Sequence, residues 1–255
     1  MRDVFGQPLM RGPAFVWKLL RALWHALVGY LTIKLKFPRL TQPDRDARVQ
    51  AWAGQMLAIV GITLDVRGTP PASGPVLLVS NHISWLDILV MHAARHCRFV
   101  SKADVGNWPF VQTLADGAGT LYIERESRRD AHRMVVHMAE RLTAGDILCV
   151  FPEGTTGDGI TLKTFHANLI QAAVEAVVPV QPVALKFVDI ATNQTSFAPR
   201  YVDDDTLTTS IWNTLTAPPL KAVVVFGEPQ MPGDHTRRSW AVALRSDIEQ
   251  LRAQA

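Results

Sequence analysis

The sequence contains little cysteine and little charge. Its two cysteines, Cys97 and Cys149, form no CxxC pair, which argues against a disulfide framework and predicts a reducing, cytosol-facing location. Charged residues make up 19% of the chain, compared with about 25% in an average soluble domain, and hydrophobic residues make up 48%. This balance predicts that some apolar surface faces lipid.

The N-terminus also lacks the features of a cleaved signal peptide, so we expect it to be retained. Residues 14–36 are the most apolar stretch, but polar side chains recur in it at helical spacing and form one stripe: Lys18, Arg21, His25, Thr32 and Lys36. The twelve residues between Arg21 and Lys34 give about 18 Å of helix, less than a hydrocarbon core of about 30 Å. Because this stretch also carries Trp17 and Trp24, we predict that it forms a helix lying in the membrane interface. Packing of the helix on the protein's own core is the alternative.

Two regions are expected. Asp44 is predicted to cap a second helix, which completes a membrane-associated two-helix hairpin over residues 1–62. From residue 63 to 255, β-rich runs alternate with helical ones, which is typical of an α/β domain with helices around a mostly parallel or mixed sheet of about seven strands. The predicted strands are 63–68, 76–80, 98–101, 120–124, 146–151, 178–185 and 221–227, and the predicted helices are 84–95, 129–144, 165–177, 206–215 and 236–253.

The run VLLVSNHISWLDILV places Asn81 and His82 directly after a buried strand, with Asp87 five residues beyond His82. Loops at strand ends are where α/β proteins build their sites. If the intervening residues turn, the Asp87 carboxylate can accept the imidazole N–H of His82 and leave its other nitrogen basic. The pair could then take a proton from an alcohol, although such a spacing also arises by chance and Asp87 could simply cap a helix.

The segment FPEGTTGDG follows another predicted strand and brings Glu153 into a glycine-rich turn. Such a turn can direct backbone N–H groups at an anion, or its glycines can be purely structural. Gly154 and Gly159 stand as in a phosphate-binding loop, but Ile160 replaces the lysine that nucleotide binding requires. Nucleotide binding by this motif is therefore disfavoured.

Two cations also fall at predicted strand ends. Lys102 ends RFVSK, and Arg125 ends TLYIER after Gly119. Both could bind a phosphate or carboxylate, and solvated surface residues are the alternative. The net charge of +3 and the pI near 9.0 fit anionic membranes, phosphorylated substrates or nucleic acid equally well.

Four segments together resemble the sequence blocks of the glycerolipid acyltransferase superfamily. NHISWLD is similar to its N-H-x-x-x-x-D block, GTLYIER to its G-x-x-F/Y-I-x-R block, FPEGTT to its E-G-T block, and VPVQPVAL, with Pro179 and Pro182, to its proline-containing block. The order and separation of the blocks also match. The resemblance covers roughly residues 75–190 and is closest to the bacterial enzymes that acylate 1-acyl-glycerol-3-phosphate.

This resemblance implies that a fatty acyl chain moves from acyl-CoA or acyl-carrier protein to the sn-2 hydroxyl of a lysophospholipid, giving phosphatidic acid. His82 would act as general base and Asp87 would hold it, with no covalent acyl-enzyme, no cofactor and no metal. The expected location is the cytoplasmic face of a bacterial inner membrane, with lysophospholipid, acyl donor and membrane as partners and no nucleic acid. The substrate-binding residues implied by the blocks are Asn81, Lys102, Gly119, Arg125, Glu153, Gly154 and Thr155.

One departure concerns the acceptor. The family commonly continues E-G-T with arginine and serine, whereas Thr156 and Gly157 stand here. Either Lys102, Arg125 or Lys163 compensates, or the headgroup is not a simple phosphate monoester. The GTTGDG form is similar to that of some bacterial relatives that acylate lyso-ornithine lipid, so this acceptor stays open.

Three other functions are alternatives. A serine hydrolase could use Ser80 or Ser84 beside His82, but no G-x-S-x-G elbow is present. A metal site could combine the catalytic pair with the aspartates at 203–205, although such runs more often cap helices or lie in solvent. A membrane-binding scaffold without catalysis is the third, and the retained His82 and Asp87 argue against it.

Overall fold

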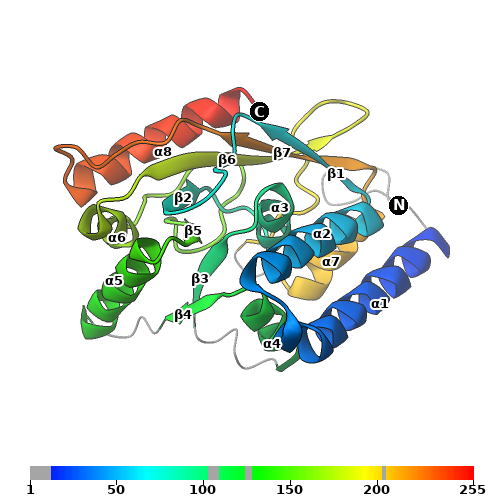
Figure 1. Ribbon diagram of the computed structural model, residues 1–255. Helices are drawn as coiled ribbons and strands as arrows, with labels where there is room; N and C mark the ends of the chain where they lie inside the picture. Colours follow the sequence, from blue (N-terminus) through cyan, green and yellow to red (C-terminus); the bar gives the residue numbers. More distant parts are fainter. Residues whose placement is uncertain (1–12, 103–108, 124–127, 203–204) are drawn as a thin grey trace.

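The computed structural model describes residues 13–102, 109–123, 128–202 and 205–255. In this part of the chain, a seven-stranded sheet lies between two layers of helices (Figure 1). The strand order is β1-β7-β6-β2-β5-β3-β4. The strands are β1 (Ile62–Arg67), β2 (Val76–Ser80), β3 (Arg98–Lys102), β4 (Leu121–Ile123), β5 (Ile147–Val150), β6 (Val180–Asp189) and β7 (Leu220–Phe226).

The sheet is mixed but mostly parallel. Only the β6–β7 pair is antiparallel among the described pairs, so β1 and β7 run against the other five strands. All seven strands overlap the ranges predicted from the sequence, and the α/β fold class is confirmed. Since β2 and β5 are parallel neighbours, the segments that follow them leave the same edge of the sheet.

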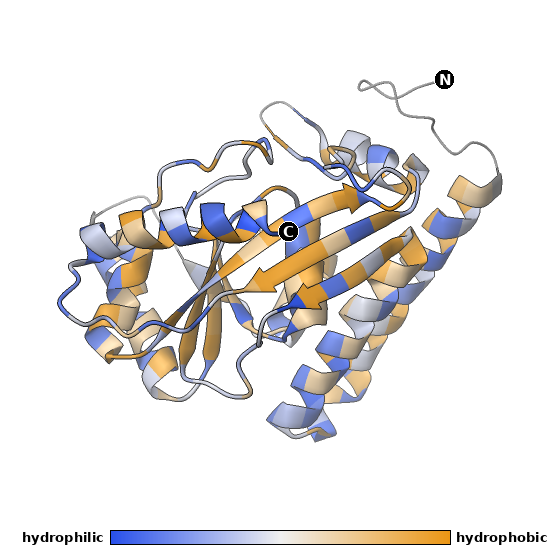
Figure 2. Cartoon of the chain, turned by 90° about the horizontal axis from the view of Figure 1, so that it is seen from above, coloured by the Kyte–Doolittle hydropathy of each residue, from blue (hydrophilic) through white to orange (hydrophobic). Residues whose placement is uncertain are grey.

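The burial of strand β2 shows that helices cover the sheet on both faces. All five of its residues are buried, as expected for a central parallel strand. Leu77 and Val79 point into one core cluster, with α5 (Arg128–Thr143), α6 (Asn168–Ala176) and α8 (Arg237–Ala253). Val76 and Leu78 point into the other, with α2 (Gln42–Val60) and α3 (Leu86–Ala94). Figure 2 shows the strands as mostly apolar, interrupted by some hydrophilic positions, with helices of mixed polarity around them.

The predicted helices are present, with one wrong cap and one helix that was missed. Thr41, not Asp44, is the N-cap of α2: its Oγ1 accepts a hydrogen bond from the Asp44 backbone N–H, because Thr41 has the extended backbone that a cap requires. Pro43 then occupies the first turn, where its missing N–H costs nothing. No prediction covered α4 (Pro109–Gly117), a nine-residue helix. The remaining helical segments are η1 (Phe37–Arg39) and α7 (Leu207–Thr216).

Helix α1 (Pro13–Leu35) and α2 form the predicted two-helix hairpin, and α1 packs on the protein through a mixed face. Of the predicted polar stripe, Lys18, His25 and Thr32 are half-buried, whereas Arg21 and Lys36 are exposed, and Phe15, Leu19, Ala22 and Ala26 pack against the core. The Lys18 Nζ donates to the Leu215 carbonyl at 3.5 Å, and the His25 ring stacks on Trp52. The outer face of α1 is strongly apolar, with Trp17 at 63% and Trp24 at 66% of full accessibility. Among the described helices, none has the length and apolar character needed to cross a bilayer. The predicted boundary at residue 62 lies where α2 meets β1, and α2 shares its core with the sheet.

Candidate active site

The site lies where β2 and β5 end side by side. Val79 of β2 pairs with Val150 of β5, so His82 and Glu153 each stand three residues beyond paired positions. Parallel strands bring such residues to one edge of the sheet, where α/β proteins place their ligands. The fold therefore brings together two of the blocks identified in the sequence.

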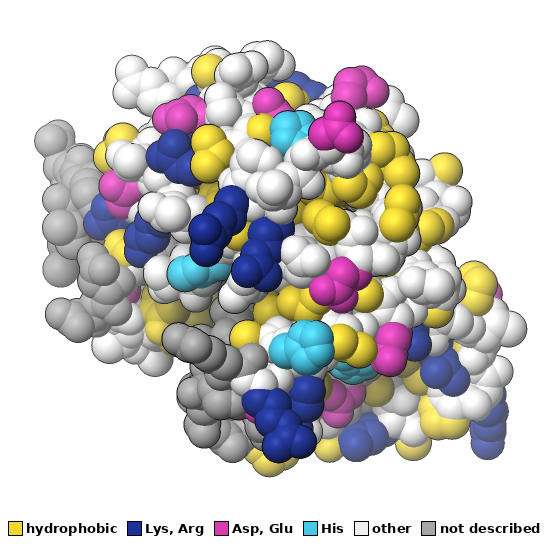
Figure 3. Space-filling model, turned by 90° about the vertical axis from the view of Figure 1, so that its left-hand side faces the viewer, with side chains coloured by type: hydrophobic (Ala, Val, Ile, Leu, Met, Phe, Trp, Pro, Cys, Tyr) yellow, Lys and Arg dark blue, Asp and Glu magenta, His cyan; other side chains and the backbone are white. Residues whose placement is uncertain are grey.

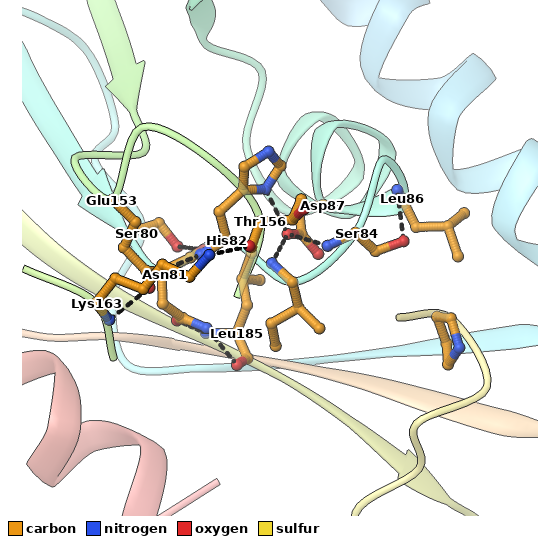
Figure 4. Close-up of polar contacts among 12 residues, drawn as sticks. Ser80, Asn81, His82, Ser84, Leu86, Asp87, Glu153, Thr156, Lys163 and Leu185 are labelled. Atoms are coloured by element: carbon orange, nitrogen blue, oxygen red, sulfur yellow. Dashed lines mark hydrogen bonds and ion pairs between the residues drawn. The ribbon is translucent and has the colours of Figure 1, made fainter. Parts of the chain in front are cut away.

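His82 and Asp87 form the predicted pair (Figure 4). The Asp87 Oδ2 accepts three hydrogen bonds, from the His82 Nδ1 at 2.8 Å, the Ile83 backbone N–H at 2.6 Å and the Ser84 backbone N–H at 2.9 Å. The two backbone bonds arise because residues 83–86 turn tightly into α3, which begins one residue before Asp87. Asp87 is fully buried, whereas His82 keeps 19% of its side-chain surface exposed.

This geometry selects a tautomer for His82. A carboxylate oxygen can only accept, so the Nδ1 carries the hydrogen and the Nε2 keeps its lone pair. Figure 4 shows the Nε2 pointing away from the other labelled side chains, and it makes no hydrogen bond within the described residues. In the neutral form of this tautomer, the Nε2 could accept a proton while the buried Asp87 carboxylate lies behind the ring.

Glu153 supports His82 from the adjacent strand end. Its Oε1 accepts the His82 backbone N–H at 2.8 Å, and its Oε2 accepts the Lys163 backbone N–H at 2.8 Å. Burial raises the pKa of Glu153, while these two backbone hydrogen bonds act in the opposite direction. The Gly157 N–H donates to the His82 carbonyl at 2.7 Å. The loop after β5 thus holds the backbone of His82 on both sides.

Asn81 has a similar supporting position. Its side-chain amide donates to the Leu185 carbonyl at 3.0 Å and its Oδ1 accepts the Leu185 N–H at 2.7 Å. These bonds fix the end of β2 to β6. Asn81 and Glu153 were predicted to bind substrate, and that remains a prediction, but their polar atoms are already bonded to the protein backbone.

The other predicted residues are spread over three segments. Gly154 adopts φ +75°, and a Cβ there would lie 2.9 Å from the His166 ring, while Thr155 is exposed. Gly119 adopts φ +76° against the Arg98 side chain. The positive φ at both positions therefore favours glycine for conformational reasons alone. Lys102 ends β3 with a side chain outside the described part, and Arg125 lies outside the described residues.

The C-terminal helix holds the outer part of the loop after β5. The Arg252 Nη2 donates to the Gly159 and Ile160 carbonyls, and the Arg245 Nη2 donates to the Leu162 carbonyl at 2.7 Å. Nothing in the sequence pattern of the loop predicts these contacts, because they join positions more than eighty residues apart. They make α8 part of the support for Glu153.

Phe151 was also missed in the sequence. Its ring stacks on the His82 imidazole with centroids 4.0 Å apart and an interplanar angle of 7°. Its position directly after β5 and two residues before Glu153 could have indicated that Phe151 lies at the site.

The rival sites are less well formed. Ser80 and Ser84 are buried, and their hydroxyls bond to backbone groups, the Asn81 carbonyl and the Leu86 N–H, rather than to the His82 ring. Asp203 and Asp204 lie outside the described residues, and Asp205 accepts the Val202 N–H at 3.1 Å. Within the described ranges, no three His, Cys, Asp or Glu side chains are grouped to hold a metal ion.

Comparisons with known proteins identify the family of the chain. A family model described as Acyltransferase matches residues 63–186. The chain is 38% identical over 167 residues to the lyso-ornithine lipid O-acyltransferase of Pseudomonas aeruginosa, a match covering 65% of this chain but only 64% of that relative. It is 35% identical over 184 residues to the 1-acyl-sn-glycerol-3-phosphate acyltransferase of Neisseria gonorrhoeae, covering 72% of this chain and 71% of that relative.

The fold has a solved counterpart. The crystal structure of the 1-acyl-sn-glycerophosphate acyltransferase from Thermotoga maritima matches with a TM-score of 0.68 at 17% identity, over 93% of this chain and 97% of that one. At this identity the likeness shows a shared fold. The sequence matches carry the family assignment, and the chain belongs to the glycerolipid acyltransferase family.

Proposed function

We propose that this protein transfers a fatty acyl chain from acyl-CoA or acyl-carrier protein to the sn-2 hydroxyl of 1-acyl-glycerol-3-phosphate, giving phosphatidic acid. The observation that carries the proposal is the 2.8 Å bond between the His82 Nδ1 and the buried Asp87 carboxylate, with no hydrogen bond at the Nε2 from any described residue. Family membership supplies the reaction class. The acceptor, the donor and the mechanism are the proposal.

In the proposed mechanism, the His82 Nε2 removes the proton from the acceptor hydroxyl as its oxygen attacks the thioester carbonyl carbon. Asp87 stabilises the imidazolium that forms. The tetrahedral intermediate then collapses, the carbon–sulfur bond breaks, and the imidazolium returns its proton to the leaving thiolate. The products are the ester and the free thiol of the carrier, and no acyl group is attached to the protein.

The acceptor headgroup is proposed to meet the loop after β5. The Lys163 Nζ donates to the Thr156 carbonyl at 2.9 Å, so its ammonium lies beside the position where the family commonly has arginine. Lys163 is exposed and keeps two further N–H donors, which supports its use for a phosphate. Lys163 is thus the cation within the described residues that best compensates for the missing arginine.

A second acceptor has its own support. Thr156 and Gly157 replace the arginine and serine of the family pattern, and the chain is 38% identical to a lyso-ornithine lipid O-acyltransferase. A zwitterionic ornithine headgroup needs less positive charge than a phosphate monoester. Lyso-ornithine lipid is therefore the alternative acceptor.

We also propose that α1 binds the membrane interface. Its exposed face carries nine large apolar side chains, each at least 39% accessible: Val16, Trp17, Leu20, Leu23, Trp24, Leu27, Val28, Leu31 and Leu35. Burial of the Lys18 ammonium lowers its pKa, so turning this side chain inward has a cost. A helix that exposes two tryptophans among these apolar side chains, with Arg21 also exposed, is suited to lie in a lipid headgroup region. The proposed location is the cytoplasmic face of a bacterial inner membrane, which the two free, buried cysteines support.

The donor is anionic whether it is acyl-CoA or acyl-carrier protein. On the face made by α5, α6 and the start of α8, Lys, Arg and His side chains gather around a hollow (Figure 3). The groove there is lined by His132, Arg237 and Arg238, with one carboxylate, Glu175, among them. This surface supports an anionic donor without choosing between the two.

The first experiment is an acylation assay with purified protein, both donors, and lysophosphatidic acid or lyso-ornithine lipid as acceptor. We expect labelled phosphatidic acid that disappears with His82→Ala, and a KM for lysophosphatidic acid raised about tenfold in Lys163→Met. Labelled ornithine lipid alone would move the proposal to the second acceptor. Release of free fatty acid without ester would favour a hydrolase, and vesicle binding without any product would favour a scaffold.

The membrane proposal needs a separate test. Flotation with anionic vesicles should recover the wild type and lose most of the Trp17→Ser/Trp24→Ser double variant. Val242→Ser is the matched control, because Val242 is 71% exposed on α8, on the other face of the sheet. Equal flotation of all three proteins would refute the role of α1.

A further inference from the structure

The ring of Phe151 covers one face of the His82 imidazole. The two rings are nearly parallel, at 7°, with centroids 4.0 Å apart. Phe151 follows β5 directly and belongs to the segment that leads to Glu153, yet no step of the proposed mechanism uses it. Its position against the proposed base suggests a function of its own.

A single hydrogen bond does not fix an imidazole ring. The bond from Nδ1 to the Asp87 Oδ2 holds one ring atom, and Oδ2 is itself held by two backbone N–H groups. The ring can still swing about this contact and carry the Nε2 with it. A flat ring packed against one face removes that freedom, because tilting the imidazole would drive it into Phe151 or open a gap between the rings.

Phe151 is itself held in place by a column of rings. It stacks on Phe99 at 5.6 Å and 17°, and Phe99 packs against the edge-on ring of His92 at 5.0 Å and 89°. His92 also stacks on His96 at 5.1 Å, and the His96 Nε2 lies 3.1 Å from the Asp46 carboxylate of α2. Phe99 is 3% and His92 is 4% exposed, so the column is anchored in the core between the sheet, α3 and α2.

We propose that Phe151 is a positioning residue that sets the plane of the His82 imidazole, so that the Nε2 faces the acceptor hydroxyl. This inference rests on the proposed acyltransferase function. Asp87 sets the tautomer and the position of one ring atom, and Phe151 sets the orientation of the ring about it. The two residues restrain different motions, so losing either one leaves the other unable to compensate.

The test compares Phe151→Leu, Phe151→Tyr and Phe187→Leu. Phe187 is a 2% exposed phenylalanine on β6, so its substitution controls for a lost aromatic ring in the core. We expect Phe151→Leu to lower kcat about 10- to 100-fold, because misplacement of a reacting group by about 1 Å costs that much, with KM changed less than about threefold. Phe151→Tyr keeps the ring and should restore at least about half of kcat. Phe187→Leu should lower stability to urea but leave kcat nearly unchanged.

A second readout does not require turnover. With ¹⁵N-labelled histidine rings, wild-type His82 should give one sharp set of ring correlations, and Phe151→Leu should give broadened or doubled ones while Phe187→Leu does not. If the wild type transfers no acyl group, the proposed function fails, and the ring correlations still decide whether Phe151 orders His82. If Phe151→Leu behaves like Phe187→Leu in both kcat and ring correlations, the inference is overturned.

Discussion

Replacing Asp87 by asparagine should remove the charge behind His82 while keeping the geometry. The Ile83 and Ser84 N–H groups need an acceptor where Oδ2 now lies, so the asparagine is expected to place its carbonyl oxygen there. Its NH₂ group then occupies the place of Oδ1, which has no hydrogen-bond partner among the described residues. The His82 Nδ1–H still finds an acceptor, and the tautomer is retained.

The size of the loss follows from the distance between the two groups. An imidazolium and a carboxylate joined at 2.8 Å attract each other by about 6 kcal/mol in an effective dielectric of about 20. If about half of the charge has developed in the transition state, about 3 kcal/mol is lost, which corresponds to about a 100-fold fall in kcat. KM should change little, since the substrate does not contact Asp87 in the proposed mechanism.

The assay measures kcat and KM for acyl transfer, with urea unfolding to compare stability. Asp87→Ala serves as the contrasting variant, because it leaves three donors without an acceptor and should lose both activity and stability. If Asp87→Asn is well folded and its kcat is within about threefold of the wild type, the charge of Asp87 does not stabilise an imidazolium. The general-base reasoning would then be wrong.

Three further substitutions test the surroundings of the site. The side chain of Glu153→Gln can accept a hydrogen bond from only one of the two backbone N–H groups that Glu153 now accepts. We expect the free energy of unfolding, measured in urea, to fall by about 1 to 3 kcal/mol and kcat/KM to fall as well. Wild-type values for both would contradict the supporting role of Glu153. Arg252→Met should lower kcat/KM about tenfold by releasing the loop after β5. Arg48→Met, an exposed position on α2, is the control and should not lower it; equal effects would refute the role of the Arg252 contact. Burial, with a smaller contribution from His96, lowers the pKa of His92 from 6.5 to about 3. Below about pH 6.5, His92 therefore binds a proton in the unfolded chain but not in the folded chain, so the folded state loses stability as the pH falls. From pH 7.5 to 5, the wild type should therefore lose about 2 kcal/mol more stability in urea unfolding than His92→Leu, and equal losses would contradict this.

The sheet could be predicted from the sequence because its strands are short, apolar and separated by clear turn signals. The helix over residues 109–117 was missed because its two ends, Pro109 and Gly117, are also typical turn residues. The cap of α2 was assigned to Asp44 because both Thr41 and Asp44 are good capping residues in the same segment. Only the backbone conformation of Thr41 distinguishes them.

In the active site, the sequence predicted the residues that share one local segment. His82 and Asp87 are five residues apart, so their contact depends on a single turn. The contact of Glu153 with the His82 backbone depends instead on the pairing of β2 with β5, and the contacts of Arg252 depend on the packing of α8. Long-range contacts of this kind leave no spacing pattern in one sequence.

The orientation of α1 marks a different limit. Periodicity shows which side chains share a helix face, and of the predicted polar stripe Lys18, His25 and Thr32 are half-buried whereas Arg21 and Lys36 are exposed. It does not show which face points toward the protein, because that depends on what the neighbouring elements offer. Trp52 accepts a hydrogen bond from His25 through its backbone carbonyl and stacks on its ring, while Phe15, Leu19, Ala22 and Ala26 pack against the core, so α1 meets the protein with a mixed face. The strongly apolar face is left for a surface outside the protein, which is why the membrane proposal depends on the fold rather than on hydropathy alone.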